Sequence, residues 1–228
     1  MSIEPDLTAP SPALVRAFLH EARNVAFGLS VTLDALQEEP APGAAIFEHA
    51  PALLASAGRT SRLMNELVAY LAPVVPERAP IDLFGSLRAV TAEVAPLWAL
   101  RRLSVQLPGS PHPAFFMGDA RLVHQALCVL LHGVEFLAPG TGNIIFSATV
   151  RRELASLFLD VSVVAPAEVA PERLATLFEP FALRSPRFTG FSLALAYRSL
   201  VAQGVRVVVT SPSKETIDLC ASFPLADP

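Results

Sequence analysis

Residues 11–37, SPALVRAFLHEARNVAFGLSVTLDALQ, decide how the N-terminal part of the chain folds. Ser11 suits the N-cap position of a helix, and Pro12 suits the first helical turn. Apolar side chains then recur at helical spacing, at Leu14, Phe18, Val25, Leu29, Leu33 and Leu36. The stretch therefore predicts one long helix, and residues 1–10 before it are expected to form a disordered tail.

A second helical pattern follows the break EEPAPG at residues 38–43 and ends at the proline-rich stretch PVVPERAP, residues 73–80. Pro51 is expected to kink this helix or to delay its start. Two long helices with a short connection predict an antiparallel hairpin over residues 11–75. A lone hairpin buries two apolar stripes poorly, so two copies of the chain are expected to pair as a four-helix bundle.

From residue 79 to residue 228 the pattern alternates between strands and helices. A short strand and a helix are expected within 81–100, a strand at 103–107, a helix at 118–137, strands at 143–150 and 156–164, a helix at 190–203, and strands at 205–211 and 217–223. This order predicts an α/β sandwich. The expected fold class is therefore α+β, with the helical hairpin first and the sandwich second.

Composition excludes several classes of protein. The net charge of −4 and the pI of about 5.7 argue against a nucleic-acid binder, which usually has a basic face. The two cysteines, Cys128 and Cys220, match neither a disulfide framework nor a zinc-ligand spacing. No signal-peptide pattern and no apolar run of membrane-spanning length occur in the sequence. We therefore expect a cytoplasmic protein with no membrane contact.

Five motifs follow one another in a characteristic order. They are HEARN at 20–24, SRLMNELVAYLAP at 61–73, GDARLVHQALCVLL at 118–131, LFEPF at 177–181 and TGFSLALAYRSLVAQG at 189–204. In this order they resemble the transmitter core of bacterial histidine kinases, in which a dimerising hairpin precedes an ATP-binding α/β domain. The resemblance covers residues 12–225, and it implies a homodimer whose first motif is the H-E-x-x-N phosphoacceptor motif.

Three ATP contacts of that family are missing together. Cys128 and His132 stand where the resemblance implies the two asparagines of the N box, and residues 163–169, VVAPAEV, hold neither the Asp nor the Gly of the first glycine box. Only Gly190 remains of the second glycine box, and the short lid after Phe181 has no glycine. Glycines allow a backbone to approach phosphates closely, and a buried adenine amino group needs an acceptor. The domain is therefore expected to be degenerate and to bind neither ATP nor a metal.

The phosphoacceptor motif, in contrast, is complete. The resemblance makes His20 the phosphoacceptor, and Glu21 can accept a proton from its imidazole. Asn24 lies one turn further on the same face, where it can position a water or a phosphoryl group. Arg16 and Arg23 can offset phosphate charge and contact a partner. We expect His20 to point outward, because the apolar stripe of this helix occupies a different face.

The sequence thus predicts a histidine phosphotransfer protein, similar to stand-alone histidine phosphotransferases and not an ATP-dependent kinase. His20 would pass phosphoryl groups between aspartates of response regulator receiver domains, which would supply Mg²⁺. One alternative is a pseudokinase scaffold that regulates a response regulator, or a phosphatase in which Asn24 orients the attacking water. Another is a true kinase with an unusual nucleotide site. The sequence gives no role to His124 or His132, and Cys128 is expected to be a small core residue.

Overall fold

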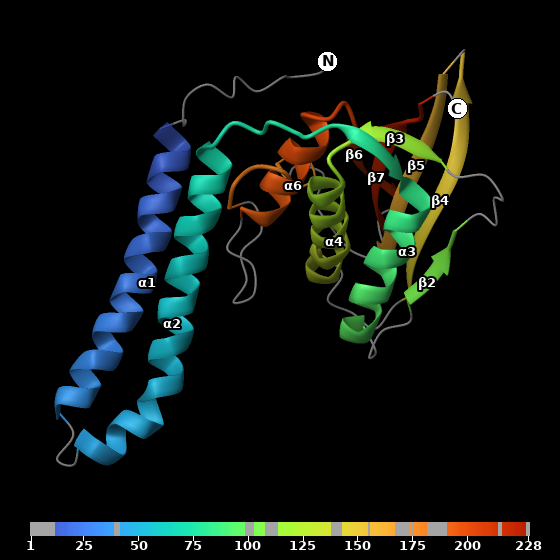
Figure 1. The fold of residues 1–228 in the computed structure, drawn as a ribbon. Helices are drawn as coiled ribbons and strands as arrows, with labels where there is room; N and C mark the ends of the chain where they lie inside the picture. The colour runs from blue at the N-terminus through green and yellow to red at the C-terminus, as the bar shows by residue number, and fades with distance from the viewer. Residues whose placement is uncertain are drawn as a thin grey trace.

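A computed structural model describes residues 12–38, 42–98, 103–107, 114–137, 143–154, 156–166, 174, 176–181, 191–213 and 216–226. The expected tail, residues 1–10, lies outside the described residues. Within them, two long helices come first, and a mixed arrangement of helices and strands follows (Figure 1). The predicted α+β class is confirmed.

The hairpin consists of helix α1 (Pro12–Glu38) and helix α2 (Pro42–Leu71), which run antiparallel and side by side (Figure 1). Both helices begin with a proline, whose fixed φ and missing N–H suit the first turn. Pro51 lies inside α2, and the helix bends near its N-terminal end (Figure 1). The proline therefore kinks the helix without delaying its start.

One face of α1 is shielded from solvent. Its half-buried residues recur at intervals of three or four, and they are Ala17, Phe18, Ala22, Val25, Leu29 and Thr32. Such spacing is typical of a helix that packs along one stripe. The remaining described positions of α1 are exposed, and they include several large apolar side chains.

The second part of the chain contains all the expected strands and helices and one strand that the sequence did not predict. The elements are β1 (Ala79–Asp82), α3 (Leu83–Val94), the 3-10 helix η1 (Ala95–Trp98), β2 (Leu103–Gln106), β3 (Phe115–Gly118), α4 (Ala120–Leu137), β4 (Ile144–Glu153), β5 (Ser156–Pro166), α6 (Ser192–Val201), β6 (Arg206–Ser213) and β7 (Thr216–Pro224). The missed strand, β3, has only four residues and pairs antiparallel with β1. Its residues pair with residues 33 to 39 positions earlier in the chain, in the register Ala79↔Gly118 to Asp82↔Phe115. A local sequence pattern does not reveal such a distant partner.

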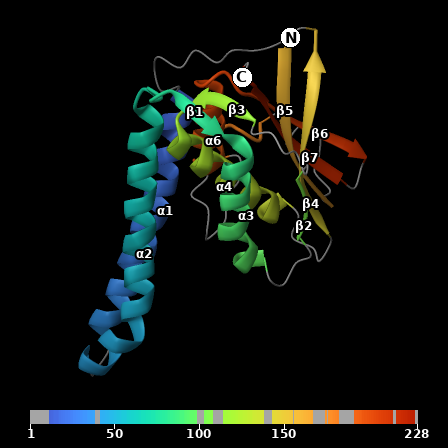
Figure 2. The same ribbon diagram turned by 45° about the vertical axis from the view of Figure 1, so that its right-hand side comes forward.

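The main sheet is mixed, with strand order β2-β4-β5-β7-β6. Strand β2 pairs parallel with β4, and the other neighbours pair antiparallel. Helices α3, α4 and α6 lie on one face of this sheet (Figure 2). On β5 the residues Leu159, Val161, Val163 and Ala165 are buried, and those between them are less buried. This alternation is expected of a strand with one face against a core.

Two apolar clusters hold the molecule together. The larger one fills the space between the sheet and helices α3, α4 and α6. The smaller one consists of Leu63 of α2 with Phe181 and Phe191, and half-buried residues of α1 pack against it. The motif LFEPF therefore contributes a buried ring to the contact between the hairpin and the second part of the chain.

Candidate functional site

His20 and Asn24 lie on an exposed face of α1, as the sequence predicted. The side-chain nitrogen Nδ2 of Asn24 lies 3.2 Å from Nδ1 of His20. In the tautomer of His20 that carries its proton on Nε2, the amide N–H of Asn24 donates to Nδ1. The pair therefore sets the orientation of the ring on a surface that a partner can reach.

The surroundings of His20 combine positive charge with exposed apolar groups. Arg16 and Arg23 are exposed on the turns that flank His20. Phe27 and Val31 follow on the same face, seven and eleven residues after His20, and their side chains are 68% and 50% exposed. The sequence reasoning missed these two residues, although their spacing from His20 was the signal. The side chain of Glu21 lies outside the described part of the structure.

The hairpin contacts helix α6 through a small polar and aromatic junction. The hydroxyl of Ser192 donates a 3.1 Å hydrogen bond to Oε1 of Glu66, and burial raises the pKa of Glu66. The guanidinium of Arg198 lies 4.7 Å from the ring centroid of Tyr70 and donates to the carbonyl of Ala72 at 3.4 Å. These contacts, with the smaller apolar cluster, connect α2 and α6.

Asp119 caps helix α4 and joins three parts of the chain. Its Oδ1 accepts from the backbone N–H groups of Arg121 and Leu122 at 3.0 and 3.1 Å, and its Oδ2 accepts from Glu77 at 3.3 Å. Its own N–H donates to Oε1 of Gln203 at 2.6 Å. Burial alone would raise the pKa of Asp119, but the backbone donors outweigh it and lower the pKa. The start of α4 is therefore fixed by an ionised, buried carboxylate.

A pocket of about 420 Å³ lies beside α4, between that helix, α3, α6 and Glu66 of α2. Cys128 and His132, which stand at the expected N-box positions, both line this pocket. Glu66 and Glu93 line it as well. The pocket therefore contains carboxylate, imidazole and thiol groups.

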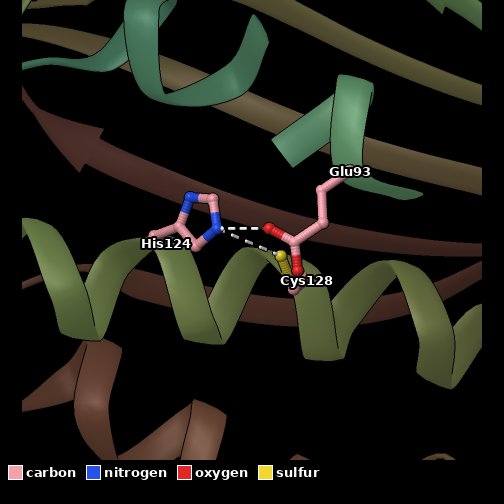
Figure 3. A group of neighbouring side chains, drawn as sticks. All are labelled: Glu93, His124 and Cys128. Carbon is pink, nitrogen blue, oxygen red and sulfur yellow. Dashed lines mark hydrogen bonds and ion pairs between the residues drawn. The ribbon is translucent and has the colours of Figure 1, made fainter. Parts of the chain in front are cut away.

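Three of these groups lie together (Figure 3). Nε2 of His124 lies 2.8 Å from Oε2 of Glu93 and 3.7 Å from Sγ of Cys128. Burial and the charge of Glu93 raise the pKa of the Cys128 thiol to about 11. Cys128 is buried, as expected of a core residue, but its sulfur faces the pocket lining. The sequence reasoning missed this cluster, because Glu93 comes from another helix and only the four-residue spacing of His124 and Cys128 was visible.

The expected glycine boxes are only partly described. Residues 163–166 form the end of β5, whereas residues 167–169 lie outside the described residues. Gly190 and the expected lid between Phe181 and Phe188, residues 182–187, also lie outside them. Among the described helices none is both long and apolar enough to cross a membrane.

Comparison with known proteins relates the fold to histidine kinases. The chain resembles the mycobacterial sensor histidine kinase MprB, with a TM-score of 0.54, 17% identity, and coverage of 66% of this chain and 99% of that one. It also resembles the Acinetobacter baumannii histidine kinase AdeS, with a TM-score of 0.64 and 18% identity, and the match covers 91% of this chain and 98% of that one. The match to full-length ShkA in complex with AMPPNP has a TM-score of 0.60 and 21% identity, and it covers 79% of this chain and 40% of that one. No protein-family model and no curated protein matches the sequence.

At these identities the similarity concerns the fold. The chain has the fold of a histidine kinase core, and its mixed sheet with helices on one face resembles the ATPase domain of those kinases. Fold alone does not determine activity, which depends on the side chains of the site.

Proposed function

We propose that this chain is a histidine phosphotransfer protein of a two-component phosphorelay. The observation that carries the proposal is the exposed His20, which lies on one helix face with Asn24 and between Arg16 and Arg23. The histidine kinase fold supports a place in two-component signalling. Phosphoryl transfer depends mainly on positioning and on charge neutralisation, and this face offers both.

In the proposed transfer, a ring nitrogen of His20 attacks the phosphorus of a receiver aspartyl phosphate in line. A P–N bond forms while the P–O bond to the aspartate breaks, and the aspartate leaves as a carboxylate. Mg²⁺ held by the receiver and the guanidinium groups of Arg16 and Arg23 offset the phosphoryl charge. Glu21 stabilises the proton on the other ring nitrogen. The reverse sequence delivers the group to a second receiver.

Phe27 and Val31 are proposed to form the apolar part of the receiver-docking surface. They lie on the His20 face, and their side chains are largely exposed although both are apolar. Apolar and aromatic groups beside a polar rim are typical of the centre of a protein interface. A receiver bound there would have its aspartate close to the His20 turn.

The chain is proposed to work without ATP. Among the described residues that line the pocket, Glu66 and Glu93 are acidic and none is Lys or Arg. A nucleotide triphosphate placed there would meet like charges instead of compensating ones. The replacement of both N-box asparagines by Cys128 and His132 also supports this proposal.

The chain is also proposed to be a homodimer. On α2 the exposed residues Leu54, Ser61, Met64, Val68 and Leu71 recur at the three-, four- or seven-residue intervals of a heptad. On α1 Leu19, Ala26 and Leu33 recur every seven residues and are likewise exposed. Such stripes pack against a partner hairpin in four-helix bundles.

The proposed transfer is tested with a receiver domain that carries labelled phosphate. The wild-type chain should take up label, His20→Ala should not, and His49→Ala should behave as the wild type because His49 lies on the other helix. Labelled ATP, offered to the same proteins in a parallel reaction, should leave all of them unlabelled.

Failure of the wild type to accept label from any receiver would contradict the phosphotransfer proposal, and so would equal labelling of His20→Ala. Circular dichroism establishes that the variants remain folded. Binding of a nucleotide, measured by calorimetry, would contradict the ATP-independent mechanism separately.

A phosphatase or scaffold is the second candidate, and the exposed amide of Asn24 beside His20 favours it. An amide in this position can orient a water for attack on a receiver phosphate. In that case dephosphorylation of the receiver would persist in His20→Ala and disappear in Asn24→Ala. A scaffold without chemistry would bind the receiver equally well in both variants.

A further inference from the structure

We propose that Glu93, His124 and Cys128 form a binding site for a divalent cation that prefers thiolate and imidazole ligands, such as Zn²⁺. The proposal is independent of the phosphotransfer function of His20. It rests on three donor atoms from two helices, one atom per residue, all within 4.8 Å of one another (Figure 3).

The helical geometry brings two of the donors together. His124 and Cys128 are four residues apart on α4, so their side chains lie over one another on the same face. Glu93 points from α3 towards that face (Figure 3). A pair from one helix and a third ligand from a neighbouring helix is a compact way to build a metal site.

The distances suit the proposed ion. A tetrahedral site with metal–ligand bonds of about 2.0–2.3 Å places its donor atoms roughly 3.3–3.6 Å apart. The separation of 3.7 Å between Nε2 of His124 and Sγ of Cys128 is close to this value, and the 2.8 Å between His124 and Glu93 would widen by roughly half an ångström. Small side-chain rotations are enough for that change, because Glu93 is exposed.

Charge balance favours the ion as well. The proton of the Cys128 thiol passes to solvent when the metal binds, so the two positive charges meet one thiolate and one carboxylate. Nε2 of His124 carries the proton in its hydrogen bond with Glu93, so metal binding requires the neutral tautomer with its proton on Nδ1. Nε2 then donates its lone pair to the metal, and the hydrogen bond with Glu93 is replaced by two metal bonds. The bound site is neutral, which suits a partly buried position.

The pocket provides access and a fourth ligand. All three residues line it, so an ion can enter from the pocket and complete its coordination there with water. His132, four residues after Cys128, lines the same pocket and is a second source of an imidazole nearby. An open position of this kind is typical of zinc sites that exchange a ligand.

The test uses the full chain, freed of any affinity tag and titrated with Co²⁺ as a spectroscopic probe. We expect one Co²⁺ per chain, with a thiolate-to-metal charge-transfer band and the visible bands of four-coordinate cobalt. The thiolate band should vanish in Cys128→Ser and persist in Cys220→Ser, the matched control on β7. In Glu93→Gln the affinity should fall at least about tenfold while the band remains.

A second readout is thermal stability with Zn²⁺. At about a hundredfold excess over Kd the melting temperature should rise by roughly 5–10 °C in the wild type and in Cys220→Ser. It should not rise in Cys128→Ser or His124→Ala. The proposal is wrong if the wild type shows no thiolate band, if Cys128→Ser retains it, or if Cys220→Ser loses it.

Discussion

At the scale of the residue, the contact between Asn24 and His20 couples the orientation of the Asn24 amide to the tautomer of the imidazole. In the tautomer with its proton on Nε2, Nδ2 of Asn24 donates to Nδ1, and Nε2 has no free lone pair. Attack through Nε2 requires the proton to move to Nδ1. Nδ1–H then donates a hydrogen bond to Oδ1 of Asn24 once the amide has turned by half a rotation. Asn24 is therefore a positioning residue for either form of the ring.

Asn24→Ala should slow the transfer of label to His20 by roughly threefold to tenfold, because one hydrogen bond of this kind contributes about 0.5–1.5 kcal/mol. Initial rates measure this effect, and ¹⁵N chemical shifts of the imidazole report the change in tautomer. Asn65→Ala, on the exposed surface of α2, serves as the control. A complete loss of transfer in Asn24→Ala would instead place Asn24 in contact with the phosphoryl group.

At the scale of the element, the first turn of helix α4 is stabilised by its cap residue, because no acidic side chain lies in that turn to interact with the helix dipole. Asp119, just before it, satisfies two backbone donors of that turn and one of the linker. The same helix carries His124, Cys128 and His132. The position of α4 therefore determines where these three side chains line the pocket.

Asp119→Ala should lower the free energy of unfolding by about 1–3 kcal/mol at neutral pH, because the cap is lost and buried donors remain unpaired. The pKa of Asp119 is lowered in the fold from an ordinary value of 3.8, so its ionised form stabilises the fold. That contribution is complete above pH 3.8 and is lost as the pH falls through the lower, folded-state pKa.

Urea unfolding, at neutral pH and below pH 4, measures the difference in free energy of unfolding between the wild type and Asp119→Ala. This difference in free energy of unfolding should become smaller as the pH falls. Asp34→Ala, at an exposed position of α1, should show little change at any pH. A difference in free energy of unfolding that does not depend on pH would mean that Asp119 stabilises the fold without its charge.

At the scale of the whole molecule, the arrangement leaves one side of the hairpin against the second part of the chain and another side uncovered. Leu63, Phe181 and Phe191 close the covered side. On the uncovered side Leu54 and Val68 are 73% and 67% exposed. Apolar stripes of this length on a helix are the usual mark of an interface.

Val68→Glu should convert the proposed dimer into a monomer, because two glutamates would approach each other in the bundle. Sedimentation measures the mass of the particle. Val150→Glu is the matched control, since Val150 is an exposed valine on β4 that lies outside the hairpin. A wild-type chain that sediments as a monomer, or a Val68→Glu chain that remains dimeric, would contradict the four-helix bundle.

The sequence by itself was sufficient for the order of the elements other than strand β3 and for the exposure of His20. Helical spacing in residues 11–37 and alternation in the strands are local properties, and they do not depend on distant contacts. Pro51 shows the limit of such local rules, because the helix continues through it and bends. Residue types also identified Asn24 as the neighbour of His20, since an interval of four residues on a helix determines proximity.

Only the tertiary structure decided how distant segments meet. Strand β3 exists because it pairs with β1, and Phe181 is buried because the hairpin covers it. Glu93 joins His124 and Cys128 from a separate helix, 31 residues before His124. Burial and proximity between distant residues arise from packing of the whole chain, and no local spacing records them. The physical reason is that the periodicity of a segment specifies which of its own faces is apolar. Which other element packs against that face is decided by the packing of the whole chain.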